Sequence, residues 1–192
     1  KDAEPKELRT LPKVMERIQA VKDFRLSSKA KEIRKFAETP TLFAQQTQPV
    51  GEPFVIVPIV SSSRRRYIPM GYVDGDTIVN NRVFLIPNAD LFMFGILNSN
   101  VHNAWMRKVA VRLKNDYSYS KDLVYNTFPI PELTVEHKKN ISETAKSILD
   151  ARAFYPNSSL ADLYDPLLMP IELRKAHIAN DKAVMAAYGF SL

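Results

Sequence analysis

The spacing of apolar residues changes twice along this chain of 192 residues. Residues 5–37 carry apolar side chains at helical intervals, whereas FVIVPIV at 54–60 is a short run rich in β-branched residues, which is typical of a strand. Helical spacing returns from residue 132 onward. Helices at both ends with strands between them predict an α+β fold, in which a small β-rich centre is flanked by helical segments.

Local signals place the ends of several expected elements. A hairpin or meander is expected over 64–87, around the turn Asp-Gly-Asp at 74–76. Residues 89–109 have a helical spacing, with an interruption expected at Asn-Ser-Asn 98–100. Thr134 is a candidate N-cap, and Gly189 is a candidate helix stop. We therefore divide the chain into a helical segment at 1–40, a β-rich segment at 41–131 and a helical segment at 132–192.

Composition narrows the class of protein. Apolar residues make up 45% of the sequence, so a packed core is expected. The absence of cysteine excludes disulfides, thiol nucleophiles and cysteine-bound zinc, and it is compatible with a reducing cytoplasm. No apolar run reaches the length of a membrane span, and the charged N-terminal residues do not resemble a signal peptide. We expect a cytoplasmic protein without a membrane partner, and the missing initiator methionine suggests a fragment of a longer chain.

The net charge of +6 is unevenly distributed. Residues 1–35 carry 11 basic and 6 acidic side chains, a net +5, and residues 36–131 carry 9 and 7, a net +2. Residues 132–192 carry 7 and 8, a net −1. The first two-thirds would favour an acidic partner such as nucleic acid, although a solvated basic helix face would give the same count.

The sequence lacks the usual signatures of catalysis. The five glycines are scattered, so no loop is built for a dinucleotide or S-adenosylmethionine, and the three histidines lack metal-ligand spacing. Asp122, Glu136 and Lys138 resemble the carboxylate and lysine set of metal-dependent nucleases. In such nucleases the Glu-x-Lys usually lies on a strand, whereas here a helix start is expected, and chance explains the pattern better.

The stretch RLKNDYSYSKDLVYNTFPIP at 112–131 suggests base reading. Lys114 and Asp116 lie two residues apart, so on an extended segment they would point the same way. Lysine donates to guanine O6 and N7 and aspartate accepts from cytosine N4, so the pair could read one G·C base pair, with Ser118 next on that face. A solvent-facing ion pair on an edge strand is the alternative. If the stretch is extended, neither of its two alternating sets of side chains is apolar enough to face a core.

Other basic and polar runs could join this surface. Arg64, Arg65 and Arg66 would suit phosphate contacts or simply a basic turn, and Asn81 with Arg82 could read bases or form a turn. The remaining basic residues near Trp105 extend the positive surface: Arg107, Lys108 and Arg112.

Three stretches together resemble the MmeI-like family of restriction–modification proteins and DNA adenine methyltransferases. They are YIPMGYVDGDTIVNN, FGILNSNVHNAWMRKVAVRLKNDYSYSKDLVYNTFPIPEL and LADLYDPLLMPIELRKAHIANDKAVMAAYG, and the resemblance covers roughly residues 50–190. It implies a bacterial DNA target-recognition domain with C-terminal helices, bound to double-stranded DNA. Residues 1–40 would be a connector from an upstream methylase domain of the same chain.

The resemblance also implies roles. The family's methylase uses S-adenosylmethionine to methylate adenine N6, and some members cut DNA. The methylase motifs are missing here, since Asn126-Thr127-Phe128-Pro129 is not its Asn-Pro-Pro-Tyr, so this part should be non-catalytic and hold no cofactor. The family's base-reading pair falls on Lys114 and Asp116. Further base-facing positions fall on Asn81, Arg82 and Ser118, and backbone contacts are expected from Tyr119 and Lys121. A protein-interaction module remains the alternative.

Overall fold

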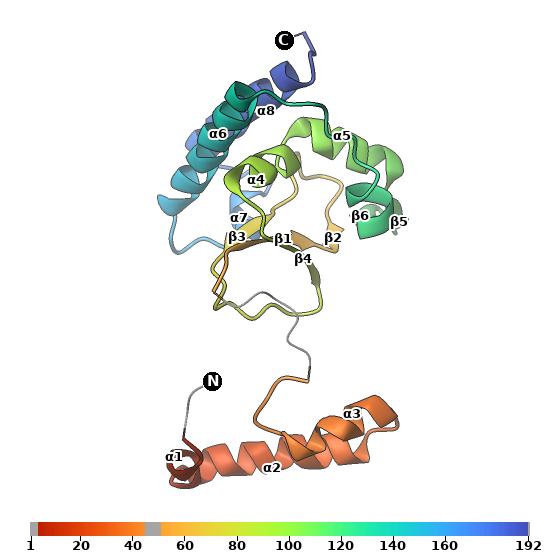
Figure 1. The fold of residues 1–192 in the computed structure, drawn as a ribbon, viewed down its shortest axis with the longest axis vertical. Coiled ribbons are helices and arrows are strands. Elements are labelled where there is room, and N and C mark those ends of the chain that lie inside the picture. Colours follow the sequence, from red (N-terminus) through yellow and green to blue (C-terminus); the bar gives the residue numbers. More distant parts are fainter. Residues whose placement is uncertain (1–3, 45–50, 192) are drawn as a thin grey trace. The chain divides into compact units, whose positions relative to one another are not determined.

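The computed structural model describes residues 4–44 and 51–191. The chain divides into two compact units, with the division between residues 47 and 48, and each is described by itself. Its mixture of helices and small antiparallel sheets confirms the predicted α+β class (Figure 1). None of the described helices is long and apolar enough to cross a membrane.

The first unit consists of helices with almost no core. It contains α1 (Pro5–Arg9), α2 (Pro12–Ser27), α3 (Lys31–Lys35) and the 3-10 turn η1 (Phe36–Glu38). Proline opens α1 and α2, where a missing N–H costs nothing. Arg25 holds the return of the chain, because its guanidinium donates to the carbonyls of Phe36 at 2.7 Å and Leu42 at 2.8 Å. Ala37 is the one buried residue among those described in this unit.

The second unit contains two three-stranded antiparallel sheets. In the first, β1 (Phe54–Pro58) lies between β3 (Gly71–Val73) and β4 (Val83–Pro87). The prediction of a hairpin or meander over 64–87 is therefore wrong, because β3 and β4 each pair with β1 and not with each other. The β-branched run fills the central strand, where Phe54, Val55 and Val57 are buried.

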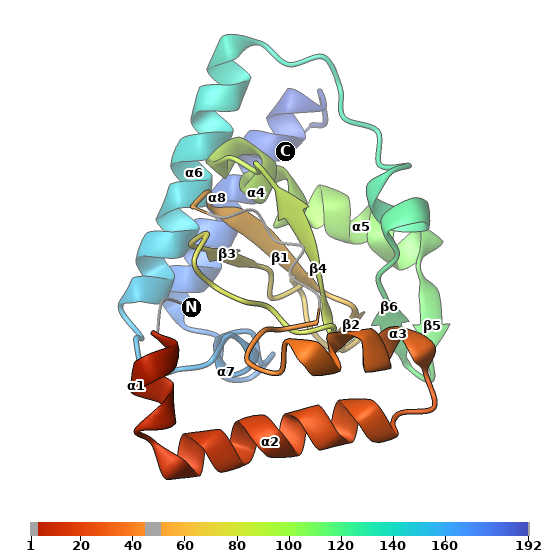
Figure 2. The ribbon, with the colours of Figure 1, turned by 60° about the horizontal axis from the view of Figure 1, so that its bottom comes forward.

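The second sheet has β6 (Asp116–Ser118) between β2 (Val60–Ser61) and β5 (Val111–Leu113). Ile59 joins the two sheets: its N–H donates to the Arg82 carbonyl at 3.0 Å, and its own carbonyl accepts from the Tyr119 N–H at 2.7 Å. The β5–β6 hairpin lies on the opposite side of the second unit from α6 in both views (Figure 1 and Figure 2).

Two short helices cover the sheets. They are α4 (Leu91–Leu97) and α5 (Asn100–Val109), and the break that Asn-Ser-Asn predicted between them is confirmed. Ser99 causes this break because its side chain caps α5, accepting from the His102 N–H at 3.2 Å. Phe94, Ile96 and Leu97 of α4 are buried in the core.

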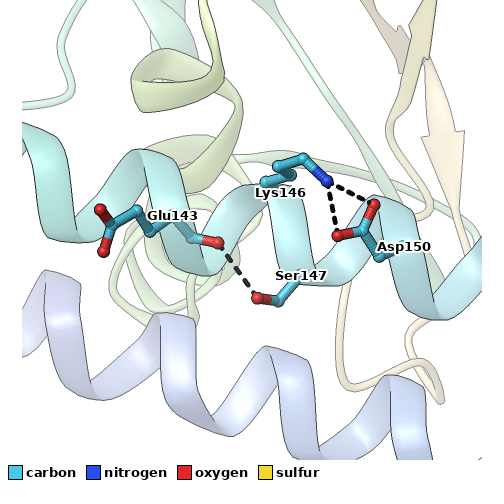
Figure 3. Close-up of polar contacts among 4 residues, drawn as sticks. All are labelled: Glu143, Lys146, Ser147 and Asp150. Atoms are coloured by element: carbon cyan, nitrogen blue, oxygen red, sulfur yellow. Dashed lines mark hydrogen bonds and ion pairs between the residues drawn. The ribbon is translucent and has the colours of Figure 1, made fainter.

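The C-terminal part contains α6 (Val135–Ala153), α7 (Leu160–Leu163) and α8 (Ile171–Ala187). The predicted ends are confirmed: Thr134 caps α6, and Gly189, with φ of 69°, follows α8. Helix α6 packs on α4 and α8, and its side chains Ile141, Ala145 and Ile148 are buried. Lys146 and Asp150 form an exposed ion pair on α6, and the Ser147 hydroxyl donates to the Glu143 carbonyl (Figure 3).

A polar network ties the segment after β2 to the C-terminal helices. Tyr67 donates from its hydroxyl to Asp181 Oδ2 at 2.7 Å, and the Asn100 N–H donates to Asp181 Oδ1 at 2.7 Å. The Tyr67 ring also stacks on His177, with 4.1 Å between the ring centroids. Because buried polar groups are costly without partners, this network fixes how the 62–70 segment sits on α8.

Candidate nucleic-acid interface

The β5–β6 hairpin ends in a two-residue turn at Lys114 and Asn115. The register pairs Leu113 with Asp116, so these two residues occupy the centre of the turn. Lys114 has φ of 56°, a left-handed conformation that side chains other than glycine and asparagine rarely adopt. Lys114 is therefore not on an extended segment as expected, because it forms the turn itself, and its side chain is exposed at the tip.

A depression of about 410 Å³ brings the two predicted readers together. It is lined by Ser62, Ser63, Arg64, Lys114, Asn115 and Asp116. Asp116 is half-buried there, and its Oδ1 accepts from the Ser63 N–H at 3.1 Å. Among the described residues, Oδ2 of Asp116 has no hydrogen-bond partner. The depression is therefore lined by a carboxylate with one free oxygen and by a lysine.

Ser62 and Ser63 are part of this site, although sequence reasoning did not select them. They follow β2, which pairs with β6 through Val60 and Ser118, so the sheet carries them to the hairpin tip. The pairing joins residues more than 50 positions apart, which the local sequence does not reveal. The available signal was the run of hydroxyl side chains that leads directly into the arginine run.

The other predicted base-facing residues lie on β6 and directly before β4. Asn81 and Arg82 are exposed just before β4, and Ser118 is half-buried on β6. Ile59 bonds to both neighbouring backbones, because its N–H donates to the Arg82 carbonyl and its carbonyl accepts from the Tyr119 N–H, so Arg82 lies close to the segment that follows Ser118.

The arginine run and Arg107 have unequal roles. Arg64 and Arg66 are exposed, whereas Arg65 is half-buried and its guanidinium lies 3.5 Å from the Ala161 carbonyl. Arg107 donates to the carbonyls of Arg65 at 3.3 Å and Arg66 at 2.7 Å. Arg107 thus holds the loop that presents the arginines, while Lys108 beside it is exposed.

Tyr119 was expected to contact the DNA backbone, and the structure corrects this. Its ring is 4% exposed, and its hydroxyl lies 2.9 Å from His102 Nε2. Tyr117 is also buried, so the alternating set of side chains that contains Tyr117 and Tyr119 faces the core, contrary to the expectation from the sequence. Burial raises the pKa of the Tyr119 hydroxyl and lowers that of His102 to about 3, so both are neutral near pH 7.

Arg112 and Lys121 are both exposed, but their surroundings differ. The Arg112 guanidinium lies 3.7 Å from the Tyr117 ring centroid and donates to the Asn115 carbonyl at 2.9 Å. Lys121 opens the π-helical turn η2 (Lys121–Tyr125) and lines a separate depression of about 340 Å³ with Phe84 and Tyr125.

The nuclease-like set does not assemble into a metal site. Asp122 lies in η2, and Glu136 and Lys138 lie on α6, all exposed. Within residues 4–44 and 51–191, no three His, Cys, Asp or Glu side chains are grouped to bind a metal ion.

An exposed polar hairpin beside basic loops is a surface of the kind that nucleic-acid-reading domains present. Residues 1–132 match the family model described as MmeI, target recognition domain, and residues 134–192 match that of the MmeI C-terminal domain. The chain therefore belongs to the MmeI family, as the resemblance predicted.

Two relatives extend this result. The chain is 43% identical over 187 residues to DNA methyltransferase A of Bacillus subtilis (strain 168), which covers 97% of this chain and 21% of that protein. It is also similar to the structure of the Type IIL restriction-modification enzyme MmeI in complex with DNA, with a TM-score of 0.86 and 46% identity. That match covers all of this chain and 25% of the enzyme. The chain thus spans about a fifth to a quarter of these relatives.

Proposed function

We propose that this chain is the DNA target-recognition part of a site-specific adenine-N6 methyltransferase of the restriction–modification type. Family membership supports recognition of DNA, and the relatives support a parent enzyme about four to five times longer than this chain. The parent would bind S-adenosylmethionine in an upstream methylase domain, to which residues 1–40 would connect the recognition segment 41–131 and the helices 132–192. The chain itself reads sequence and performs no chemistry.

The observation that carries this proposal is the depression at the hairpin tip. The Lys114 ammonium can donate to guanine O6 and N7, while the free Oδ2 of Asp116 can accept from cytosine N4. Because the Ser63 N–H holds Oδ1, the carboxylate is oriented before DNA arrives. We therefore propose that Lys114 and Asp116 read one G·C pair.

Neighbouring residues complete the proposed interface. The exposed residues Asn81 and Arg82, with Ser118, would face neighbouring base pairs of the recognised sequence. Phosphate contacts, which set register but carry no sequence information, would come from exposed basic side chains: Arg64, Arg66, Lys108 and Lys121.

The test exchanges the two readers in the full-length parent, as Lys114→Asp with Asp116→Lys. The exchange reverses the order of donor and acceptor, so the fixed G·C pair in the methylated motif should change. The measurement is single-molecule sequencing of genomic DNA from a host that carries the enzyme. The matched control is Lys146→Asp with Asp150→Lys, which exchanges an exposed pair on the opposite side of the unit and should leave the motif unchanged. An unchanged motif in the Lys114/Asp116 variant would refute the assignment.

A second candidate is a protein-interaction module, which one apolar depression favours. It measures about 530 Å³ and is lined mainly by Trp105, Phe128, Met185, Tyr188 and Phe190. This reading predicts a stoichiometric complex with another protein and negligible affinity for DNA. Sedimentation of the chain with labelled duplex DNA and with host extract separates the two.

A further inference from the structure

Arg112 is built into the hairpin. It pairs with Tyr117 across β5 and β6, and its guanidinium lies 3.7 Å from the centroid of that ring. One nitrogen, Nη1, donates to the Asn115 carbonyl at 2.9 Å. Because Tyr117 is 8% exposed, its ring is fixed by the core. A chain of contacts therefore runs from the core through Tyr117 and Arg112 to the turn.

The turn needs such support. Lysine at φ of 56° is in a disfavoured conformation, and the sequence offers no Asn-Gly or Gly that would fix the turn by itself. Because Asn115 follows Lys114 in the turn, a rotation of the Asn115 peptide would shift Lys114 relative to Asp116. In enzymes, a displacement of about 1 Å caused by a distant substitution can lower the rate about a hundredfold.

We propose that Arg112 is a positioning residue of the base reader and not a phosphate ligand. This inference rests on the proposed function. The planar guanidinium stacks on Tyr117 and holds the Asn115 carbonyl in place, a combination that the compact lysine ammonium cannot reproduce. Arg112 thereby determines how sharply Lys114 and Asp116 distinguish their base pair.

The experiment uses the full-length parent with Arg112→Lys and Arg112→Met. Methylation rates are measured on the cognate duplex and on duplexes with the G·C pair read by Lys114 and Asp116 replaced. Arg112→Lys should lower discrimination at this pair about tenfold, because the charge remains but the fixed geometry is lost. Discrimination at the other positions of the motif should not change, which a general loss of folding would not produce. Tyr117→Phe, which keeps the ring, should retain discrimination.

The salt dependence of DNA binding provides the second readout. With Arg112→Met, the slope of log affinity against log salt should stay the same, whereas loss of a phosphate contact would reduce it by about one. Full discrimination with Arg112→Lys, or a reduced slope with Arg112→Met, would overturn the inference while the Lys114/Asp116 exchange could still succeed. Failure of that exchange to alter the motif would overturn the proposed function and this inference together.

Discussion

At the scale of single residues, Lys114 combines an unfavourable backbone conformation with a position at the centre of the proposed site. Its φ of 56° is one of two positive values among the described residues other than glycine. Glycine adopts this conformation without steric cost, so lysine here stores strain of roughly 1–2 kcal/mol. Residues under such strain cluster at functional sites, which agrees with a role for the lysine side chain.

Lys114→Gly should separate stability from recognition. Relief of the strain outweighs the greater freedom of glycine in the unfolded chain, so the free energy of unfolding should stay unchanged or rise by up to about 1 kcal/mol. Recognition of the G·C pair should be lost in the parent. Urea denaturation of the 192-residue chain measures the first effect. The matched control is Asn115→Gly, where φ is not positive and a loss of about 0.5–1 kcal/mol is expected. Equal losses in both variants would show that the Lys114 backbone is unstrained.

At the scale of elements, Gly95 lets α4 pack closely against the C-terminal helices. A Cβ at this position would lie 2.7 Å from Ile141 Cγ2 and 3.0 Å from Ala145 Cβ on α6. The Gly95 carbonyl also accepts from Asn180 Nδ2 of α8 at 2.8 Å. One residue thus joins three helices of the second unit.

Gly95→Ala should destabilise the chain by about 1–3 kcal/mol, because the added methyl group overpacks a buried contact. Helix propensity alone predicts the opposite sign, a gain of about 1 kcal/mol. Thermal and urea unfolding of the 192-residue chain therefore decide between the two effects. A more stable variant would mean that α4 and α6 separate easily at this point.

Elements whose signals are local could be predicted from the sequence, and those that depend on distant partners could not. Thr134 and Gly189 mark helix ends because capping involves residues within one turn. The expected pairing within 64–87 was wrong because β1, from earlier in the chain, inserts between β3 and β4. Tyr119 looked exposed because its partner, His102, becomes visible only in the fold.

The same distinction applies to the candidate site. The chemistry and the local spacing of Lys114 and Asp116 predict a base-reading pair, and the structure places both at one depression. The turn at Lys114 carries no glycine signal, so its geometry was missed. Ser63 was missed because only the pairing of β2 with β6 brings its N–H to Asp116.

At the scale of the molecule, two buried histidines make the folding stability of the second unit depend on pH. His102 lies behind the β5–β6 hairpin against Tyr119, and His177 lies on α8, where its Nε2 is 2.6 Å from the Tyr164 hydroxyl. Burial lowers the pKa of each to about 3, and for His177 the nearby Arg152 charge adds to the effect. Both must therefore be neutral in the folded state near pH 7.

Acidification should lower the free energy of unfolding already at pH values well above those at which most carboxylates titrate. The unfolded chain binds protons on both histidines below about pH 6.5, while the folded chain does not until about pH 3. Stability is thus complete above pH 6.5 and is lost as the pH falls through this window. From pH 6.5 to 4.5 the expected loss is about 2 kcal/mol per histidine, measured by urea unfolding of the 192-residue chain.

Single variants isolate the share of each histidine. Burial raises the pKa of Asp181, a group that is stabilised in its protonated form and so opposes the trend. Comparing His102→Gln and His177→Gln with the unsubstituted 192-residue chain removes the contribution of Asp181, because all three chains share it. Each variant should be less stable at pH 7, because glutamine leaves polar groups poorly matched, yet should lose less stability on acidification. Equal losses on acidification in the unsubstituted chain and in both variants would mean that these imidazoles accept protons without unfolding.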